Sequence, residues 1–396
     1  MTDNSWFDEL PQYYQGLGRR AGLDRIGMNR RNFMKGAGTA AAIGAGAGML
    51  PKKAKAADSM GYMCWEGYNA PVMVEPFEAE NDVSMNIDVI IDDPSSFGKL
   101  IAGGHREVDV ITLDAPWIQR MGPAGLCEYL DIADYQETYD GFYPQFAHPF
   151  VPLMHEGQIT GLPNRWGCIG MMLNSAYENL DDWNDYTPAF EPRNKDKVAM
   201  MDFGDYPILI LAQHIGVNPY VPLDQGEINE IRLILRKCFE QSRLLVGDLT
   251  LLQKGLVDGS IVTGFGCGNY CTSGARYAGH RTVLTKIPEP LENGFKRGAI
   301  WLEATAIVRE PNNPQAAENW VKWCQTEFVC RVISLGEVTS DPTPNAAVEA
   351  TYTEDERDII DMDHIWDWWD KSMFQVMLPN VDELLAIFQE ELARST

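Results

Sequence analysis

The strongest constraint on the fold is an alternation of strand-like and helix-like segments that begins near residue 58. Apolar residues from Met85 to Ile91 recur at every second position, as one face of a β-strand requires. Residues 97–102 then have helical character and end at a Gly-Gly pair, and residues 108–111 form a short apolar run typical of a buried strand. This alternation predicts an α/β fold.

The C-terminal part of the chain carries two further helix signals. Pro314 begins a segment in which apolar residues keep a 3.6-residue period as far as Val332, and residues 382–392 have the pattern of a closing amphipathic helix. A chain of 396 residues is longer than one hydrophobic core usually serves, so we expect two domains.

The N-terminal segment has the features of an export signal. The sequence NRRNFMK at 29–35 places Arg30 and Arg31 before a weakly apolar Ala/Gly run, and Ala54-Lys55-Ala56 follows as a small-x-small cleavage site. This arrangement resembles a twin-arginine signal peptide. We therefore expect residues 1–56 to be removed by the twin-arginine export machinery, and the mature protein to be periplasmic. A second pair, Arg19-Arg20, has no apolar run after it and is interpreted as ordinary surface.

The net charge excludes one class of partner. The chain carries 57 acidic and 32 basic residues, a formal net charge of −25, and nine of those basic residues lie within the first 56 positions. So acidic a surface repels nucleic acid and attracts cations into any cleft that it lines. We predict that the protein does not bind nucleic acid.

The cysteines leave two interpretations open. None of the eight forms a CxxC or a Cys/His cluster of the zinc type, and all of them follow the proposed signal. An even set in an oxidising compartment is compatible with disulfides, whereas buried free thiols that act as small hydrophobes explain the pattern equally well. The cysteines are Cys64, Cys127, Cys168, Cys238, Cys267, Cys271, Cys324 and Cys330.

The sequence contains no recognisable catalytic motif. The six histidines are scattered, no GxSxG or Walker motif is present, and the glycines at 264–268 lack the spacing of a phosphate-binding loop. We therefore predict no catalytic residues, no cofactor and no metal. What stands out is a set of tryptophans, tyrosines and carboxylates at points where strands end.

Six segments in order resemble the spermidine/putrescine-binding family of solute receptors for ABC importers. They are CWEGY at 64–68, VDVI and LDAPW between 108 and 117, LPNRWG at 162–167, DDW at 181–183, AIWLE at 299–303 and DPTPN at 341–345. The resemblance implies a two-lobed type II periplasmic-binding-protein fold with a hinge of crossing strands. It implies a first lobe of residues 57–164 plus 302–348 and a second of 165–301 plus 349–396, which close on a ligand that is bound and not transformed.

The resemblance also implies where the ligand binds. A polyamine is a cation with an apolar body, so its receptor needs aromatic faces along the chain and carboxylates at the charged ends. The substrate-binding residues that we predict are Trp65, Tyr68, Asp114, Trp117, Asp202, Asp205, Trp301, Glu303 and Asp341. The expected partners are a small cationic ligand and an ABC transporter permease.

Several positions depart from the family pattern. Asp114 and Trp117 stand where Ser and Tyr are usual, Glu303 replaces an aspartate, Asp341 replaces a tyrosine, and a family tryptophan falls near Gly266. Cation binding survives these changes, but specificity for spermidine or putrescine does not follow. Two alternatives remain, namely a receptor of the same fold for a quaternary ammonium compound or an amino-phosphonate, and an exported enzyme.

Overall fold

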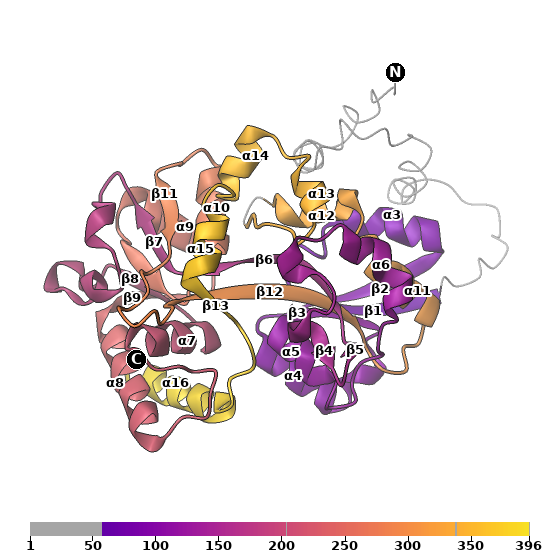
Figure 1. The fold of residues 1–396 in the computed structure, drawn as a ribbon, viewed down its shortest axis with the longest axis horizontal. Helices are drawn as coiled ribbons and strands as arrows, with labels where there is room; N and C mark the ends of the chain where they lie inside the picture. Colours follow the sequence, from indigo (N-terminus) through magenta and orange to yellow (C-terminus); the bar gives the residue numbers. More distant parts are fainter. Residues whose placement is uncertain (1–57, 203, 337–338, 396) are drawn as a thin grey trace, which may run out of the picture. The chain divides into compact units, whose positions relative to one another are not determined.

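The computed structural model of this chain describes residues 58–202, 204–336 and 339–395. In these residues strands alternate with helices, so the expected α/β fold is confirmed (Figure 1). The predicted twin-arginine motif and its cleavage site lie outside the described residues. Within the described part, no helix combines the length and the apolar character needed to cross a bilayer.

The described chain divides into two compact units. The first unit contains residues 58–164, 303–336 and 343–348, and the second contains 165–302, 339–342 and those from 349 onward. The main difference from the lobes expected from the sequence is the short segment 339–342, which the sequence places in the first lobe. Its hydrogen bonds, described below, attach it to elements of the second unit.

The first unit is built on a mixed sheet that contains both parallel and antiparallel strand pairs. Its strands and helices are β1 Asp58–Cys64, α3 Pro71–Asn81, β2 Val83–Val89, α4 Asp93–Ile101, β3 Val110–Asp114, α5 Ala115–Met121, α6 Ile132–Asp140, the hairpin β4 Met154–His155 with β5 Gln158–Ile159, α11 Pro314–Cys324 and α12 Glu327–Ser334. Short 3-10 helices lie at Gly104–Arg106, Pro144–Phe146 and Val151–Leu153. Helix α13 Ala346–Glu349 lies at the end of the last segment of this unit.

The strand order of that sheet creates a switch point. Strand β1 pairs in parallel with β2 on one side and with β3 on the other. The chain passes from β1 to β2 on one side and then crosses to β3 on the other side of β1. In open α/β sheets ligands bind beyond the carboxyl ends of strands at such a point. We call the residues at and just after the ends of β1, β2 and β3 the carboxyl edge of the first unit.

The second unit has a smaller parallel sheet. Its elements are β7 Met171–Asn174, β8 Val198–Met201, α7 Asp205–His214, α8 Gln225–Gln241, β9 Ser242–Val246, α9 Leu249–Asp258, β10 Thr263–Phe265, α10 Asn269–Tyr277, β11 Val283–Lys286, α14 Glu354–Ile359, α15 Ile365–Lys371, β13 Ser372–Phe374 and α16 Val381–Ser395. Its 3-10 helices lie at Leu180–Asp182, Thr187–Phe190 and Pro192–Asn194. Strand β8 pairs in parallel with β9 and with β10, so a second switch point lies between β8 and β10. The residues at and just after the ends of β8 and β10 form the carboxyl edge of the second unit.

Two long strands connect the units. Strand β6 Leu162–Ile169 changes unit after Asn164, and β12 Gly298–Ile307 changes unit after Leu302 (Figure 1). The start of β12 pairs in parallel with β13, and its end pairs antiparallel with β3. All residues of both strands are buried, including the polar Asn164 and Arg165 of β6 and Glu303 and Thr305 of β12.

The helix predicted from Pro314 to Val332 is wrong in its extent. The structure has two helices there, because α11 ends at Cys324 and α12 begins at Glu327. Thr326 separates them: its hydroxyl donates to the carbonyl of Trp323 at 2.8 Å and accepts from the backbone N–H of Val329 at 3.4 Å. A threonine that caps a new helix ends the previous one, but the spacing of the apolar residues continues across the break. The hydrophobic pattern alone therefore did not reveal that there are two helices.

The eight cysteines are buried, and none of them forms a disulfide bond in the structure. Burial raises the pKa of the Cys127 thiol to about 12 and that of the Cys238 thiol well above its ordinary value. A protonated thiol is a poor nucleophile. The structure therefore favours the interpretation of these residues as small hydrophobes.

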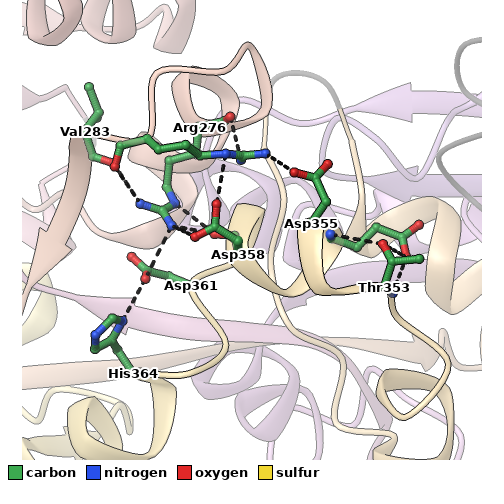
Figure 2. A network of polar contacts seen from close by, with 9 residues as sticks. Arg276, Val283, Thr353, Asp355, Asp358, Asp361 and His364 are labelled. Carbon is green, nitrogen blue, oxygen red and sulfur yellow. Dashed lines mark hydrogen bonds and ion pairs between the residues drawn. The ribbon is translucent and has the colours of Figure 1, made fainter.

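A buried arginine attaches the C-terminal segment to α10. Figure 2 shows Arg276 of α10 beside Asp358 and Asp361 of the segment that carries α14 and α15. Its guanidinium donates to the carbonyl of Val283 at 3.1 Å, and to the carbonyl and carboxylate of Asp358 at 3.0 and 2.9 Å. Asp361 lies 3.6 Å from the same guanidinium and 2.9 Å from the ring of His364, whose pKa it raises. These contacts position α15 within the second unit.

Candidate ligand-binding site

Two carboxylates face each other at the carboxyl edge of the first unit. Asp114 is the last residue of β3, and Glu303 is its direct partner in the antiparallel pair of β3 with β12. Side chains of such a pair point to the same side of the sheet, about 5 Å apart at Cβ. Asp114 is 3% exposed and Glu303 6%. The structure therefore brings together two predicted residues that lie far apart in the sequence.

A third carboxylate joins this pair and was not predicted. Asp93 lies in the first turn of α4, is 3% exposed, and accepts a hydrogen bond from the backbone N–H of Asp114 at 3.3 Å. In the sequence it stands between Asp92 and Pro94, a pattern that indicates only the beginning of a helix. Its position beside Asp114 depends on how α4 packs on the sheet.

Two aromatic residues follow β1 at the same edge. Trp65 is the first residue after the strand and is half-buried, and Tyr68 is fully buried in the turn that follows. The amide of Tyr68 donates to the carbonyl of Trp65 at 3.3 Å. Gly67 occupies φ 100°, a conformation that side chains disfavour, so this tight turn requires glycine there.

Trp117 has packing contacts instead of an open face. It lies in α5 and is 3% exposed. Its ring lies 5.6 Å from that of Phe97, and the guanidinium of Arg120 lies 5.5 Å from its centre. Since Phe97 and Arg120 already cover this ring, its contacts are those of a core residue.

The carboxyl edge of the second unit also carries acids. Asp202 follows β8, and Asp205 is the first residue of α7, where a carboxylate is favoured by the helix dipole. Asp205 is 6% exposed, and its carboxylate accepts from the amide of Tyr206 at 3.1 Å. The two predicted acids therefore lie at the same end of β8.

Aromatic rings surround the start of β12 in this unit. Trp301 is 3% exposed and contacts Tyr270 edge-on at 5.9 Å, and Tyr270 in turn contacts Tyr206 at 6.3 Å. The indole Nε1 of Trp301 is buried and has no hydrogen-bond partner among the described residues. The three rings form one continuous aromatic group.

Tyr270 was missed by the sequence reasoning. It lies in the first turn of α10, and its hydroxyl donates to the carbonyl of Gly266 at 2.7 Å. Gly266 itself has φ 74°, and a Cβ there would lie 2.6 Å from the backbone nitrogen of Pro207, so no tryptophan fits at that position. Tyr270 instead supplies an aromatic ring near the place where the family has one.

A second aromatic cluster in this unit was also missed. Trp166 is fully buried and lies 5.4 Å from Trp366 and 5.3 Å from Trp369, and Trp369 lies 6.2 Å from Phe374. Trp366 and Trp369 are three residues apart in α15 and are half-buried. The sequence signal was the WDWWD run, which an aromatic-rich site search would have selected.

Asp341, the last predicted site residue, is fully buried among hydrogen-bond donors. Its carboxylate accepts from the amide of Asn269 and from the hydroxyl of Thr339, both at 2.9 Å. Asp341 is thus part of a protein network, which we return to below.

The described residues contain no group of three or more histidine, cysteine, aspartate or glutamate side chains arranged to hold a metal ion. The chemistry that the two edges offer is that of carboxylates beside aromatic faces.

Two α/β units joined by long crossing strands, with acidic and aromatic side chains at strand ends, define the class of solute-binding proteins that serve ABC importers. The chain belongs to the family of bacterial extracellular solute-binding proteins, which matches residues 72–356.

Solved structures confirm the two-lobed binding-protein fold. A Listeria monocytogenes protein described as a spermidine/putrescine ABC transporter has a TM-score of 0.68 and 16% identity, over 85% of this chain and 98% of its own. The spermidine/putrescine substrate-binding protein PotD of Streptococcus pneumoniae has a TM-score of 0.61 and 13% identity, over 86% and 100%. The binding protein AgtB of A. tumefaciens, solved with agropinic acid, has a TM-score of 0.59 and 14% identity, over 85% and 99%.

Proposed function

We propose that this chain is a periplasmic receptor that captures a polyamine or a related organic cation and delivers it to an ABC transporter permease. The observation that carries this proposal is the cross-strand pair Asp114 and Glu303, buried at a switch point of the first unit. Like charges opposite each other in a sheet destabilise it, and a bound cation reverses that effect.

The surrounding residues suit a cation with an apolar body. Trp301 is two residues before Glu303 on β12, so their side chains point to the same side of the strand. Trp65 follows the neighbouring strand β1. Each ring that faces a cation contributes roughly 0.5 to 2 kcal/mol. In this proposal Tyr68 holds the turn that carries Trp65. Trp117 is a core residue that supports the carboxyl edge of the first unit.

We propose that the second unit supplies the other end of the site. Asp202 and Asp205 would receive a second amino group, and Trp301, Tyr270 and Tyr206 would line the apolar chain between the two charges. Closure of the two units on the ligand, as expected for this class of receptor, would then signal the loaded state to the permease.

The solved relatives include receptors for different ligands, and PotD and AgtB illustrate this by their names and ligands. The buried carboxylates support a cation over an acidic ligand here. Arg165 is a candidate for binding an acidic group, but its guanidinium donates to Thr339 at 3.3 Å within the protein. A polyamine or quaternary amine therefore fits this chain better than an amino-phosphonate does.

Native mass spectrometry of protein purified without denaturation tests this proposal, because a tightly bound ligand survives that procedure. Calorimetry would then compare spermidine, putrescine, choline and an aminoalkyl phosphonate. We expect the polyamines to bind most tightly, with an affinity that falls as salt is added. A neutral or anionic solute in the purified protein, with no heat from any amine, would contradict the proposal.

A further inference from the structure

The segment 339–342 is a short insertion of the chain into the second unit. The chain belongs to the first unit up to residue 336 and again from 343. The carbonyl of Pro342 accepts from the amide of Trp166 at 3.0 Å, and the amide of Ser340 donates to the hydroxyl of Ser273 at 2.7 Å. The segment is therefore attached to both β6 and α10.

Asp341 is the centre of these attachments. Its two carboxylate oxygens accept separately from Asn269 and Thr339, and it is fully buried. The other side of the Asn269 amide accepts from the backbone N–H of Cys168 at 2.9 Å. One side chain thus connects the inserted segment to α10 and, through Asn269, to the crossing strand β6.

Close backbone approach at β6 supports a fixed role for this network. A Cβ at Gly167 would lie 2.2 Å from the side-chain oxygen of Asn269. The amide therefore rests directly against the strand, immediately after the point at which β6 enters the second unit. Asn269 is 2% exposed, so its hydrogen bonds are shielded from water.

A separate network holds the same segments in the first unit. Asn164, the last residue of β6 in that unit, accepts from Gln325 at 2.7 Å and donates to the hydroxyl of Thr305. Its carbonyl accepts from the hydroxyl of Thr343 at 3.2 Å. Each crossing segment is thus held on both sides of the peptide bond at which it changes unit, at 164–165 and at 342–343.

We propose that Asp341 is a positioning residue that anchors the crossing segments to the second unit and sets how readily the two units close, and that it does not contact the ligand. This proposal rests on the proposed function and replaces the sequence-based assignment of Asp341 to the ligand site. Loss of the anchor lowers the fraction of molecules competent to close, which weakens binding of every ligand by the same factor.

The test compares Asp341→Ala, Asp341→Asn and Glu303→Gln in the full mature chain. An anchor works through hydrogen bonds, and asparagine retains an accepting oxygen. We expect Asp341→Ala to weaken spermidine and an uncharged analogue equally, by about five- to tenfold, and Asp341→Asn to restore most of the affinity. Glu303→Gln is the control for a ligand carboxylate and should weaken spermidine selectively.

Hydrogen exchange without ligand gives an independent readout. We expect the amides of Trp166, Cys168 and Ser340 to exchange faster in Asp341→Ala and to be unchanged in Glu303→Gln. If Asp341→Ala does not fold, Thr339→Val removes one donor only and should give the same pattern more weakly.

Two results would overturn the anchor. One is a loss confined to charged ligands in both Asp341 variants, and the other is unchanged exchange at those three amides. If the wild type binds no amine, the proposed function fails, while the exchange data still decide whether Asp341 is an anchor.

Discussion

At the scale of single residues, the proposed function rests on the charge and aromatic surface that β12 carries side by side. Trp301 and Glu303 lie two residues apart on one strand, and Asp114 lies opposite Glu303 on the next. Asp93 adds a third buried carboxylate at this edge. In the proposed function these carboxylates attract a cation, and Trp301 offers it an aromatic face.

The first prediction separates the contribution of charge to ligand binding from that of aromatic surface. Glu303→Gln should weaken spermidine by roughly ten- to a hundredfold, the worth of one hydrogen bond to a charged group, and should change the affinity of an uncharged analogue little. Trp301→Ala should weaken both ligands, because in the proposed site its ring contacts the apolar body of the ligand. Calorimetry measures each affinity. The exposed Glu137→Gln in α6 is a control for net charge, and equal losses for both ligands in Glu303→Gln would argue against charge recognition.

At the scale of secondary-structure elements, one carboxylate links the C-terminal helix α16 to helix α8. The side chain of Glu391 in α16 is fully buried and accepts from Arg236 of α8 at 2.8 and 3.0 Å. Arg232 lies 3.2 Å away and Arg394 3.0 Å away. The hydrogen bonds from Arg236 are the main reason that the pKa of Glu391 falls to about 2. Helix packing and charge pairing therefore act together between α8 and α16.

The second prediction follows from the sign of that shift. A carboxyl whose pKa is lower in the folded protein stabilises it fully above the ordinary value of about 4.5, and this contribution is lost as the pH falls toward 2. Glu391→Gln should lower the free energy of unfolding by about 1 to 3 kcal/mol at pH 7. Urea unfolding should show this difference shrinking below pH 4.5.

A neighbouring residue provides the matched control for Glu391. Glu390 also pairs with Arg232, but its side chain is 56% exposed. An exposed ion pair contributes little, so Glu390→Gln should change stability by less than about 1 kcal/mol. A pH-independent effect of Glu391→Gln would show that packing, and not charge, is what this residue contributes.

At the scale of the whole molecule, the chain combines buried thiols with a sequence that resembles an export signal. All eight cysteines are buried, and none of them forms a disulfide bond in the structure. A chain that unfolds before export would expose these thiols to an oxidising compartment, where they can form wrong disulfides. The twin-arginine route is therefore consistent with a protein that folds first in a reducing compartment.

The third prediction concerns that route. Replacing Arg30 and Arg31 with lysine should abolish export, because the paired arginines are the recognition feature of the motif. Immunoblots of separated periplasmic and cytoplasmic fractions measure the outcome. The same change at Arg19 and Arg20 is a control and should leave export intact. Full periplasmic accumulation of the Arg30/Arg31 variant would contradict a twin-arginine signal.

The sequence alone determined the α/β fold and much of the first edge of the site. Strand alternation, helix period and the placing of Trp301 and Glu303 on one face are properties of neighbouring residues, so they can be read in order along the chain. The order of motifs was enough to indicate the family, which the comparison confirmed. The export signal and the ligand contacts remain predictions.

Only the tertiary structure decided which distant residues meet. Asp93 lies 21 positions before Asp114, and Asn269 lies 72 before Asp341, so no local pattern connects either pair. In the structure Asp341 accepts hydrogen bonds from protein donors, Trp117 is surrounded by packing partners, and Tyr270 lies near Gly266. Each of these outcomes depends on how helices pack on sheets, because a side chain's function is set by the groups that burial places around it.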